Sequence, residues 1–161
     1  MTTRAAVLVT SDRIHRGEEI DRSGAAAAEA LAGAAEVIEV RVVPDEAHLI
    51  KAALVEWSDC GIDLVLTVGG TGLSPRDVTP EATRQVIERE ATGIGAGLLA
   101  RGLESTPRAM LSCGTAGVRG KTLIVNLPGS ASAVRELVPY LLQILPHALD
   151  VIRGKPEDYD T

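Results

Sequence analysis

Short apolar runs rich in β-branched residues alternate along the chain with longer segments whose apolar residues recur at helical spacing. The runs at 5–10 and 62–68 are almost continuously apolar, which is typical of strands covered on both faces in a parallel sheet. A third strand is predicted at 37–43. Strand-like pieces at 109–113 and 122–126, joined by a return that contains glycines, predict a hairpin.

Helical segments are predicted between and after these strands. Ser23 is a suitable N-cap for the first helix, and Thr79 followed by Pro80 is a suitable start for the third. Pro139 and Pro146 are expected to kink or divide the last and longest helix. The predicted helices cover residues 24–34, 47–58, 81–88, 95–104 and 131–151.

The order of strands and helices predicts the fold class. A chain of 161 residues is long enough for one domain with a sizeable core, and no repeat or linker divides it. We therefore expect a single domain over residues 1–161, an α/β protein with a three-layer α/β/α sandwich around a mostly parallel sheet. The hairpin would make that sheet mixed.

Composition narrows the classes of function. Lys and Arg number 16 against 22 Asp and Glu, which gives a formal net charge of −6. Proteins that bind nucleic-acid backbones depend on clustered Lys and Arg, so we expect no nucleic-acid partner. A local pocket for a small phosphorylated ligand is compatible with this balance. Phe is absent and aromatic residues make up 2% of the chain, so the core must be aliphatic.

The cysteines and the N-terminal segment indicate a compartment. Cys60 and Cys113 lie in different segments and form no CxxC pair, which disfavours a zinc site or a disulfide framework and suits a reducing environment. The first apolar run, at 5–9, is shorter than the about 7–15 apolar residues of a signal peptide or the about 20 of a membrane span. We therefore expect a cytoplasmic protein without a membrane partner.

A glycine-rich turn follows the strand at 62–68. Glycines without a Cβ allow several backbone N–H groups to converge on one anion, and the hydroxyls of Thr71 and Ser74 add donors. A helix that begins near Pro80 adds its positive N-terminal end. The segment has neither the GK[ST] ending of a P-loop nor a GxGxxG pattern, and an ordinary strand-to-helix turn is the alternative. The glycine turn consists of Gly69, Gly70, Thr71 and Gly72.

Acidic residues follow the predicted strands. Asp77 comes shortly after the glycine turn, and Asp45 comes shortly after the strand at 37–43. Because ligands bind at the carboxyl ends of strands in open α/β sheets, the two carboxylates are expected to face one cavity. Carboxylate oxygens are the ligands that Mg²⁺ uses together with substrate phosphates. Asp12, after the first strand, is a weaker third candidate, and helix capping is the alternative role for Asp45 and Asp77.

Two further turns contain candidates for anion binding. Pro128, Gly129 and Ser130 precede the long predicted helix, so backbone N–H groups and the Ser130 hydroxyl can hold an anion there. Arg119 and Lys121, in the hairpin return, offer positive charge to a phosphate. A plain turn with a helix cap and a solvated turn are the respective alternatives.

These motifs together resemble those of a known family. The glycine turn followed by Arg76-Asp77-Val78-Thr79-Pro80-Glu81-Ala82 is similar to the signature of the MogA/MoaB-like molybdenum cofactor proteins, a group that includes the G domain of gephyrin. The resemblance extends over nearly the whole chain and keeps the order of its blocks. Further matching blocks are Ser11-Asp12-Arg13, Asp21 with Ser23-Gly24, Val43-Pro44-Asp45-Glu46, Gly117-Val118-Arg119-Gly120-Lys121-Thr122, Val125-Asn126-Leu127-Pro128-Gly129-Ser130, and His147.

The resemblance implies a molybdopterin-binding, MogA-like fold and an activity. Family members use ATP and Mg²⁺ to adenylylate molybdopterin: the terminal phosphate of the pterin attacks the α-phosphorus of ATP, and pyrophosphate leaves. By position in the motifs, Asp45 and Asp77 correspond to the essential carboxylates, which are expected to organise Mg²⁺ and the reacting phosphates. Ser112 falls where a contact to the pterin phosphate is expected. Residues expected to bind substrate or nucleotide are Ser11, Asp12, Gly69, Gly70, Thr71, Gly72, Arg76, Thr79, Ser112, Arg119, Lys121, Asn126, Pro128, Gly129 and Ser130.

The chain departs from the family pattern at two positions. Cys113 stands where many relatives have Arg, so one phosphate contact is either absent or supplied by Arg119 or Lys121. Ala131 replaces a frequent Pro after the turn at 128–130, which is expected only to loosen the loop.

The resemblance also implies partners. A homo-oligomer is expected, with a trimer favoured over a hexamer, and the product is expected to pass to a molybdenum insertase. A molybdopterin-binding carrier without adenylyltransferase turnover is the alternative function, and the presence of both Asp45 and Asp77 favours catalysis over it. A scaffold of the gephyrin kind is disfavoured because no linker or second domain accompanies the predicted fold.

Overall fold

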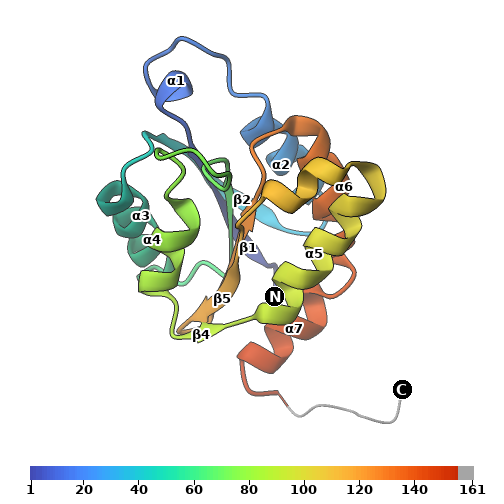
Figure 1. Ribbon diagram of the computed structural model, residues 1–161. Coiled ribbons are helices and arrows are strands. Elements are labelled where there is room, and N and C mark those ends of the chain that lie inside the picture. Colours follow the sequence, from blue (N-terminus) through green and yellow to red (C-terminus); the bar gives the residue numbers. More distant parts are fainter. Residues whose placement is uncertain (156–161) are drawn as a thin grey trace.

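A mixed six-stranded sheet runs through the centre of the protein (Figure 1). The structure, a computed structural model, describes residues 1–155. The strands lie in the order β2-β1-β3-β6-β5-β4; the first four are parallel, and the last two are antiparallel to their neighbours. The strands are β1 (Arg4–Thr10), β2 (Glu36–Val43), β3 (Leu64–Val68), β4 (Arg89–Glu90), β5 (Ala116–Arg119) and β6 (Thr122–Leu127).

Helices cover both faces of the sheet and complete a three-layer α/β/α sandwich, as predicted (Figure 1). α3 and α4 lie on one face, and α2, α5, α6 and α7 lie on the other. Among residues 1–155, no helix is both long and apolar enough to span a membrane. The helices are α1 (Asp12–His15), α2 (Ser23–Leu31), α3 (Ala47–Asp59), α4 (Thr79–Val86), α5 (Thr92–Ser105), the 3-10 helix η1 (Pro107–Leu111), α6 (Ala131–Leu142) and α7 (Leu145–Ile152).

Each face of the sheet has its own core, and both cores are aliphatic except for Trp57 of α3. Along β1, Val7 and Val9 belong to the core shared with α2 and α6, whereas Ala6 and Leu8 belong to the core shared with α3 and α4. This alternation follows from the two-residue repeat of a strand. All four side chains are at most 1% exposed. Burial on both faces explains why the sequence of β1 shows no polar alternation.

The four parallel strands end at one rim of the sheet. The register pairs Thr10 of β1 with Val43 of β2, Val9 with Val68 of β3, and Val68 with Leu127 of β6. The loops that follow these strands therefore start side by side. They contain the acidic residues and the turns for which the sequence predicts ligand binding, at the place where open α/β sheets bind ligands.

The segment after α5 differs from the sequence prediction. A strand is predicted at 109–113, but this segment lies mostly in η1, which begins at Pro107. The hydroxyl of Thr106 accepts a hydrogen bond from Arg108 N at 3.2 Å and caps the helix. The prediction was wrong because this cap and the proline favour a helical turn over a strand. The strand comes later, as β5, and Gly120, with a φ of 57°, lies in the tight turn to β6.

The two prolines of the last helical segment have different effects. Pro146 lies in the first turn of α7, and the helical segment is divided between Leu142 and Leu145, as predicted. Pro139 lies inside α6 and does not divide it. An interior proline removes one backbone hydrogen bond. The neighbouring Val138 is fully buried against the sheet, and such packing offsets the loss.

A buried polar network surrounds the end of β6. Asn126 Nδ2 donates to Thr67 Oγ1 at 2.9 Å and to Thr83 Oγ1 at 3.0 Å. Asn126 Oδ1 accepts from Thr115 N at 3.0 Å. All four residues are at most 5% exposed, so the amide of Asn126 ties β3, α4 and the segment before β5 together inside the protein.

Replacing Asn126 by alanine is expected to lower the free energy of unfolding by about 1–3 kcal/mol, because the buried N–H of Thr115 then loses its acceptor. Urea titration measures this loss. The matched control is Gln85→Ala, which removes an exposed amide bonded to Lys51 and is expected to cost less than about 0.5 kcal/mol. Equal losses in the two variants would contradict a structural role for the network.

Candidate functional site

The turn after β3 requires glycine at two positions. Gly69 and Gly70 have φ angles of 96° and 66°, in the left-handed region that residues with a Cβ rarely adopt. A Cβ on Gly69 would lie 2.6 Å from the backbone oxygen of Thr10, and a Cβ on Gly70 would overlap the hydroxyl of Thr79. The hydroxyls of Thr10 and Thr79 are 2.9 Å apart. The glycine turn is therefore pressed against the end of β1 and the start of α4.

The turn after β6 packs against the glycine turn. Gly69 N donates to Leu127 O at 3.1 Å, and a Cβ on Gly129 would lie 3.3 Å from Gly69 Cα. Ser130 is the N-cap of α6, and its hydroxyl accepts from Ala133 N at 3.2 Å. The glycine turn and the N-terminus of α6 thus lie together, and an arrangement of free backbone N–H groups at a helix N-terminus attracts anions.

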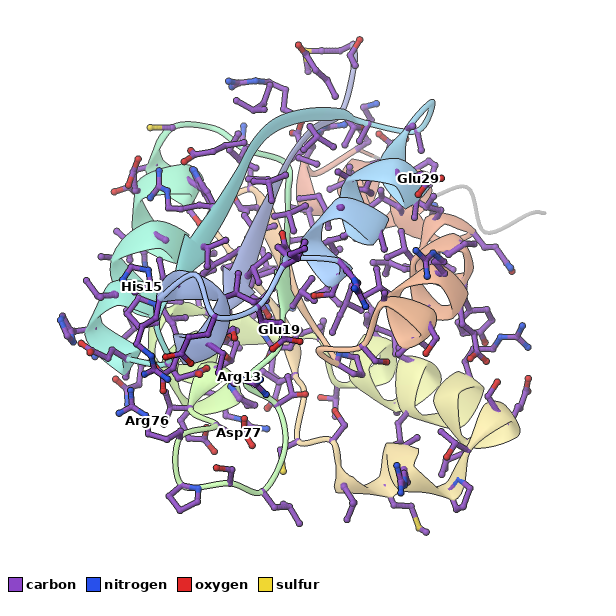
Figure 2. All side chains as sticks on the ribbon, turned by 90° about the horizontal axis from the view of Figure 1, so that it is seen from above. Arg13, His15, Glu19, Glu29, Arg76 and Asp77 are labelled. Carbon is purple, nitrogen blue, oxygen red and sulfur yellow. The ribbon has the colours of Figure 1, made fainter. Side chains whose placement is uncertain are left out.

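A cavity of about 1180 Å³ opens beside these turns. Its walls come from both turns, α5, η1 and the beginning of α6. Gly95, Ala96 and Gly102 give the α5 wall little bulk, and Leu98 and Leu99 make it apolar. Figure 2 looks onto this rim, with the loop after β3 on one side and α5 with η1 on the other. Ligand pockets usually measure about 300–1,000 Å³, so this cavity has room for two small molecules.

Asp77 lines this cavity. Its Oδ2 accepts a hydrogen bond from Ser74 N at 2.9 Å, and a Cβ on Gly72 would lie 2.9 Å from the same oxygen. Asp77 caps no helix, because the N-cap of α4 is Val78. The carboxylate is therefore held by the loop that contains the glycine turn, beside Arg76 on the same loop (Figure 2).

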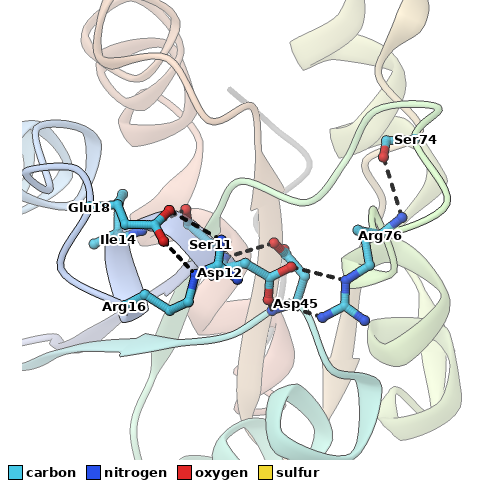
Figure 3. Close-up of polar contacts among 8 residues, drawn as sticks. All are labelled: Ser11, Asp12, Ile14, Arg16, Glu18, Asp45, Ser74 and Arg76. Atoms are coloured by element: carbon cyan, nitrogen blue, oxygen red, sulfur yellow. Dashed lines mark hydrogen bonds and ion pairs between the residues drawn. The ribbon is translucent and has the colours of Figure 1, made fainter.

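Asp45 is fixed by reciprocal hydrogen bonds with Asp12 (Figure 3). Asp12 N donates to Asp45 Oδ2, and Asp45 N donates to Asp12 Oδ1, each at 3.0 Å. Arg76 completes the group, with Nε and Nη2 donating to Asp12 Oδ2 and Oδ1 at 2.9 and 3.0 Å. We call these three residues the rim cluster. It ties together the loops that follow β1, β2 and β3.

The two acids of the rim cluster have opposite pKa shifts. Hydrogen bonds from Arg76, and then from Asp45 N, lower the pKa of Asp12. Burial raises the pKa of Asp45, and the negative charges of Asp12 and Asp77 raise it further. The hydrogen bond from Asp12 N lowers this pKa but does not cancel the rise. Asp45 Oδ1 is buried, has no hydrogen-bond partner within residues 1–155, and lies 3.3 Å from the Cβ position of Gly70. A buried acceptor of this kind is costly unless it gains a partner.

Most of the predicted site residues meet at this rim, in two sets. Asp45 does not line the cavity, which differs from the expectation that both carboxylates face it. Its Oδ1 lies 3.3 Å from the position of a Cβ on Gly70, a residue that does line the cavity. The predicted residues that line the cavity are Gly70, Thr71, Gly72, Asp77, Ser112, Asn126, Pro128, Gly129 and Ser130. Those at the rim that do not line it are Ser11, Asp12, Asp45, Gly69, Arg76 and Thr79.

Arg119 and Lys121 lie at the opposite end of the sheet. Arg119 is paired in register with Thr122, the first residue of β6, and Lys121 lies in the turn between them. Because β6 reaches the rim only at Leu127, neither cation approaches the cavity. The structure thus corrects the expectation that one of them replaces the phosphate contact missing at Cys113.

Two arginines that the sequence analysis did not single out line the cavity instead. Arg84, on α4, lies 3.9 Å from Glu90. Arg108, on η1, forms no ion pair with any residue of the described part of the chain. The sequence contains one indication of such a residue: Cys113 replaces a frequent Arg, which implied that another cation contacts the phosphate. Only the helical turn of η1, which was predicted as a strand, shows that Arg108 lies on the cavity wall.

The carboxylates of Asp45 and Asp77 suit a metal ion whose other ligands come from the substrate. No group of three or more His, Cys, Asp and Glu side chains within residues 1–155 is arranged to hold a metal ion. Mg²⁺, however, usually binds through one or two carboxylates together with substrate phosphates and waters. The unpartnered, buried Oδ1 of Asp45 and the carboxylate of Asp77 match this pattern.

Comparisons with known proteins identify the family of this chain. Residues 6–147 match the family described as "Probable molybdopterin binding domain". A relative named gephyrin, from Dictyostelium discoideum, is 41% identical over 94% of this chain, and the chain spans 23% of the length of that protein. A relative named molybdopterin adenylyltransferase, from Helicobacter pylori, is 38% identical over 95% of this chain and 89% of its own length.

A solved structure shares the whole fold. The crystal structure of the molybdopterin biosynthesis enzyme MoaB from Thermus thermophilus has 49% sequence identity and a TM-score of 0.90, and covers 98% of this chain and 100% of that one. The family match spans nearly all of both cores, the glycine turn and the rim cluster. The protein therefore belongs to the family of probable molybdopterin-binding domains and has the α/β fold of MoaB.

Proposed function

We propose that this protein transfers AMP from ATP to molybdopterin during molybdenum cofactor biosynthesis. A phosphate oxygen of molybdopterin attacks the α-phosphorus of ATP and forms a new P–O bond. The bond from the α-phosphorus to the oxygen that bridges to the β-phosphate breaks, so that the products are adenylyl-molybdopterin and pyrophosphate. The relative from Helicobacter pylori is named for this activity.

The observation that carries the proposal is the position of two carboxylates on one glycine turn. Asp45 Oδ1 lies 3.3 Å from the position of a Cβ on Gly70, and Asp77 Oδ2 lies 2.9 Å from the position of a Cβ on Gly72. Burial raises the pKa of Asp45, and the negative charge of Asp77 adds to this rise. The same turn lines the cavity of about 1180 Å³. Carboxylates beside free backbone N–H groups suit substrates that react through phosphates.

The residues around the cavity supply what this reaction needs. Transfer at phosphorus depends on alignment and on neutralisation of charge more than on covalent catalysis. Backbone N–H groups of the glycine turn and of the N-terminus of α6 are donors for phosphate oxygens. The apolar α5 wall around Leu98 and Leu99 suits the flat rings of adenine and pterin. Mg²⁺ held by Asp45, Asp77 and the substrate phosphates would neutralise charge on the phosphate oxygens.

A direct assay tests the proposal. Purified protein is mixed with molybdopterin, ATP and Mg²⁺, and the products are identified by mass spectrometry. We expect adenylyl-molybdopterin and pyrophosphate in equal amounts, and neither product when molybdopterin or ATP is left out. Tight binding of molybdopterin without any adenylylated product would contradict the proposal and would favour a carrier function.

Replacing Arg108 by alanine is expected to raise KM for molybdopterin about tenfold and to leave kcat nearly unchanged. Arg108 lines the cavity on the segment that leads to Ser112, the expected contact of the pterin phosphate. A charge-assisted hydrogen bond to a phosphate contributes about 1.5 kcal/mol, which corresponds to about tenfold in affinity. Steady-state kinetics measure the effect, with Arg135→Ala, an exposed arginine of α6 outside the cavity, as control. Equal KM values in the two variants would contradict this role.

The assembly and the partners of the protein belong to the same proposal. We propose a homo-oligomer, with a trimer favoured over a hexamer, that passes its product to a molybdenum insertase in the cytoplasm. Size-exclusion chromatography with light scattering tests the first point. A mass three times the 16.8 kDa of one chain supports the trimer, and a mass of one or two chains contradicts it.

A further inference from the structure

The charges of Asp12 and Arg76 are engaged with each other. Two nitrogens of the Arg76 guanidinium donate to the two oxygens of the Asp12 carboxylate, a bidentate geometry that is among the stronger kinds of ion pair. Asp12 Oδ1 also accepts from Asp45 N. The Asp12 side chain is only 19% exposed, against 58% for Arg76. Neither residue lines the cavity, so neither is placed to offer its charge to a ligand there.

A chain of hydrogen bonds leads from Arg76 to the free oxygen of Asp45. Arg76 holds the carboxylate of Asp12, and that carboxylate holds the backbone N–H of Asp45. The N–H of Asp12 in turn holds Asp45 Oδ2, which leaves Oδ1 beside Gly70. Without Arg76, Asp12 would present an unbalanced negative charge next to Asp45.

The same ion pair connects the loops of the two proposed catalytic carboxylates. Arg76 directly precedes Asp77 on the loop after β3, whereas Asp12 is bonded to Asp45 on the loop after β2. Figure 3 shows that Arg76 reaches across from its own loop to Asp12. The Asp12–Arg76 pair therefore fixes the position of one carboxylate relative to the other.

We propose that Asp12 and Arg76 are positioning residues for Asp45 and Asp77, and not contacts of the substrate or the nucleotide. This inference rests on the proposed AMP transfer, because it assigns the two residues a task in that reaction. A positioning pair acts as one unit, so loss of either member has the same consequence as loss of both. A residue that binds substrate would act independently of its neighbour.

A double-mutant cycle tests the inference. Arg76→Ala, Asp12→Ala and the double variant are each expected to lower kcat about tenfold, with KM for ATP and for molybdopterin changed less than about twofold. The matched control is Arg16→Ala, which breaks the bidentate pair of Arg16 with Glu18 nearby and is expected to leave kcat and KM unchanged. A tenfold rise in KM with unchanged kcat for Arg76→Ala, or a hundredfold loss of kcat in the double variant, would overturn the inference.

Crystal structures of Arg76→Ala and Asp12→Ala give a readout that does not need activity. We expect the Asp45 carboxylate to turn away from Gly70, or to occupy more than one conformation, in both variants. An Asp45 side chain in its original place in both variants would overturn the inference. If the unaltered protein makes no adenylylated product, the proposed function fails, and these structures still decide whether Asp12 and Arg76 position Asp45.

Discussion

Replacing Asp77 by asparagine is expected to lower kcat for AMP transfer by about 10²–10³-fold, equivalent to about 2–4 kcal/mol of activation free energy. Asparagine keeps an oxygen that can accept the hydrogen bond from Ser74 N, so the loop stays folded while the negative charge is lost. Steady-state kinetics at saturating ATP and molybdopterin measure the effect. The free energy of unfolding is expected to change by less than about 0.5 kcal/mol.

The control for this variant is Asp59→Asn. Asp59 is an exposed carboxylate at the end of α3, 3.9 Å from Arg119 and therefore far from the rim. It is expected to retain the unaltered rate. A rate for Asp77→Asn that equals the rate for Asp59→Asn would contradict the role proposed for Asp77.

Replacing Gly70 by alanine is expected to lower the free energy of unfolding by about 2–5 kcal/mol. Two costs add: about 1–2 kcal/mol for a side chain at a φ of 66°, and about 1–3 kcal/mol for the overlap of the new Cβ with the hydroxyls of Thr79 and Thr10. Urea titration of the variant measures the sum. Activity is expected to fall as well, because Gly70 lines the cavity and its new Cβ would lie 3.3 Å from Asp45 Oδ1.

Gly120→Ala separates the two costs of the Gly70 variant. Gly120 has a φ of 57°, and no atom lies within 4 Å of the position that its Cβ would take. Its replacement is therefore expected to cost only the about 1–2 kcal/mol of backbone strain. Equal losses in the two variants would show that contact with Thr79 and Thr10 does not restrict Gly70.

The parts of the fold that the sequence predicts correctly are those with a strong periodic pattern. The continuously apolar run of β1 predicts a strand buried on both faces, and the structure confirms it. The break before Pro146 follows from the chemistry of proline alone. The pattern fails where local capping decides, as at Thr106 and Pro107, and it gives no signal for the two-residue β4. Very short elements depend on their neighbours more than on their own residues.

The sequence predicts which loops form the candidate site, because the carboxyl ends of the parallel strands lie at one rim of the sheet. That rule predicts that Asp45 and Asp77 lie beside the glycine turn, and both do, but only Asp77 lines the cavity. Side-chain direction is not predictable in the same way. Nothing in the sequence indicates that Asp12 binds both Arg76 and Asp45, since these bonds join loops that are distant in the chain. The role expected for Arg119 was wrong because the hairpin return precedes β6 and so lies at the end of the sheet opposite the rim.

The most direct measurement follows the α-phosphorus of ATP. Protein, Mg²⁺ and molybdopterin are incubated with ATP labelled with ³²P at the α-phosphate, and in parallel with ATP labelled at the γ-phosphate, and the pterin is then separated from the nucleotides. If the protein is an adenylyltransferase, the α-label joins the pterin, the γ-label leaves in pyrophosphate, and Asp77→Asn suppresses both. Pterin that stays bound but unlabelled, while all α-label remains in ATP, would contradict it.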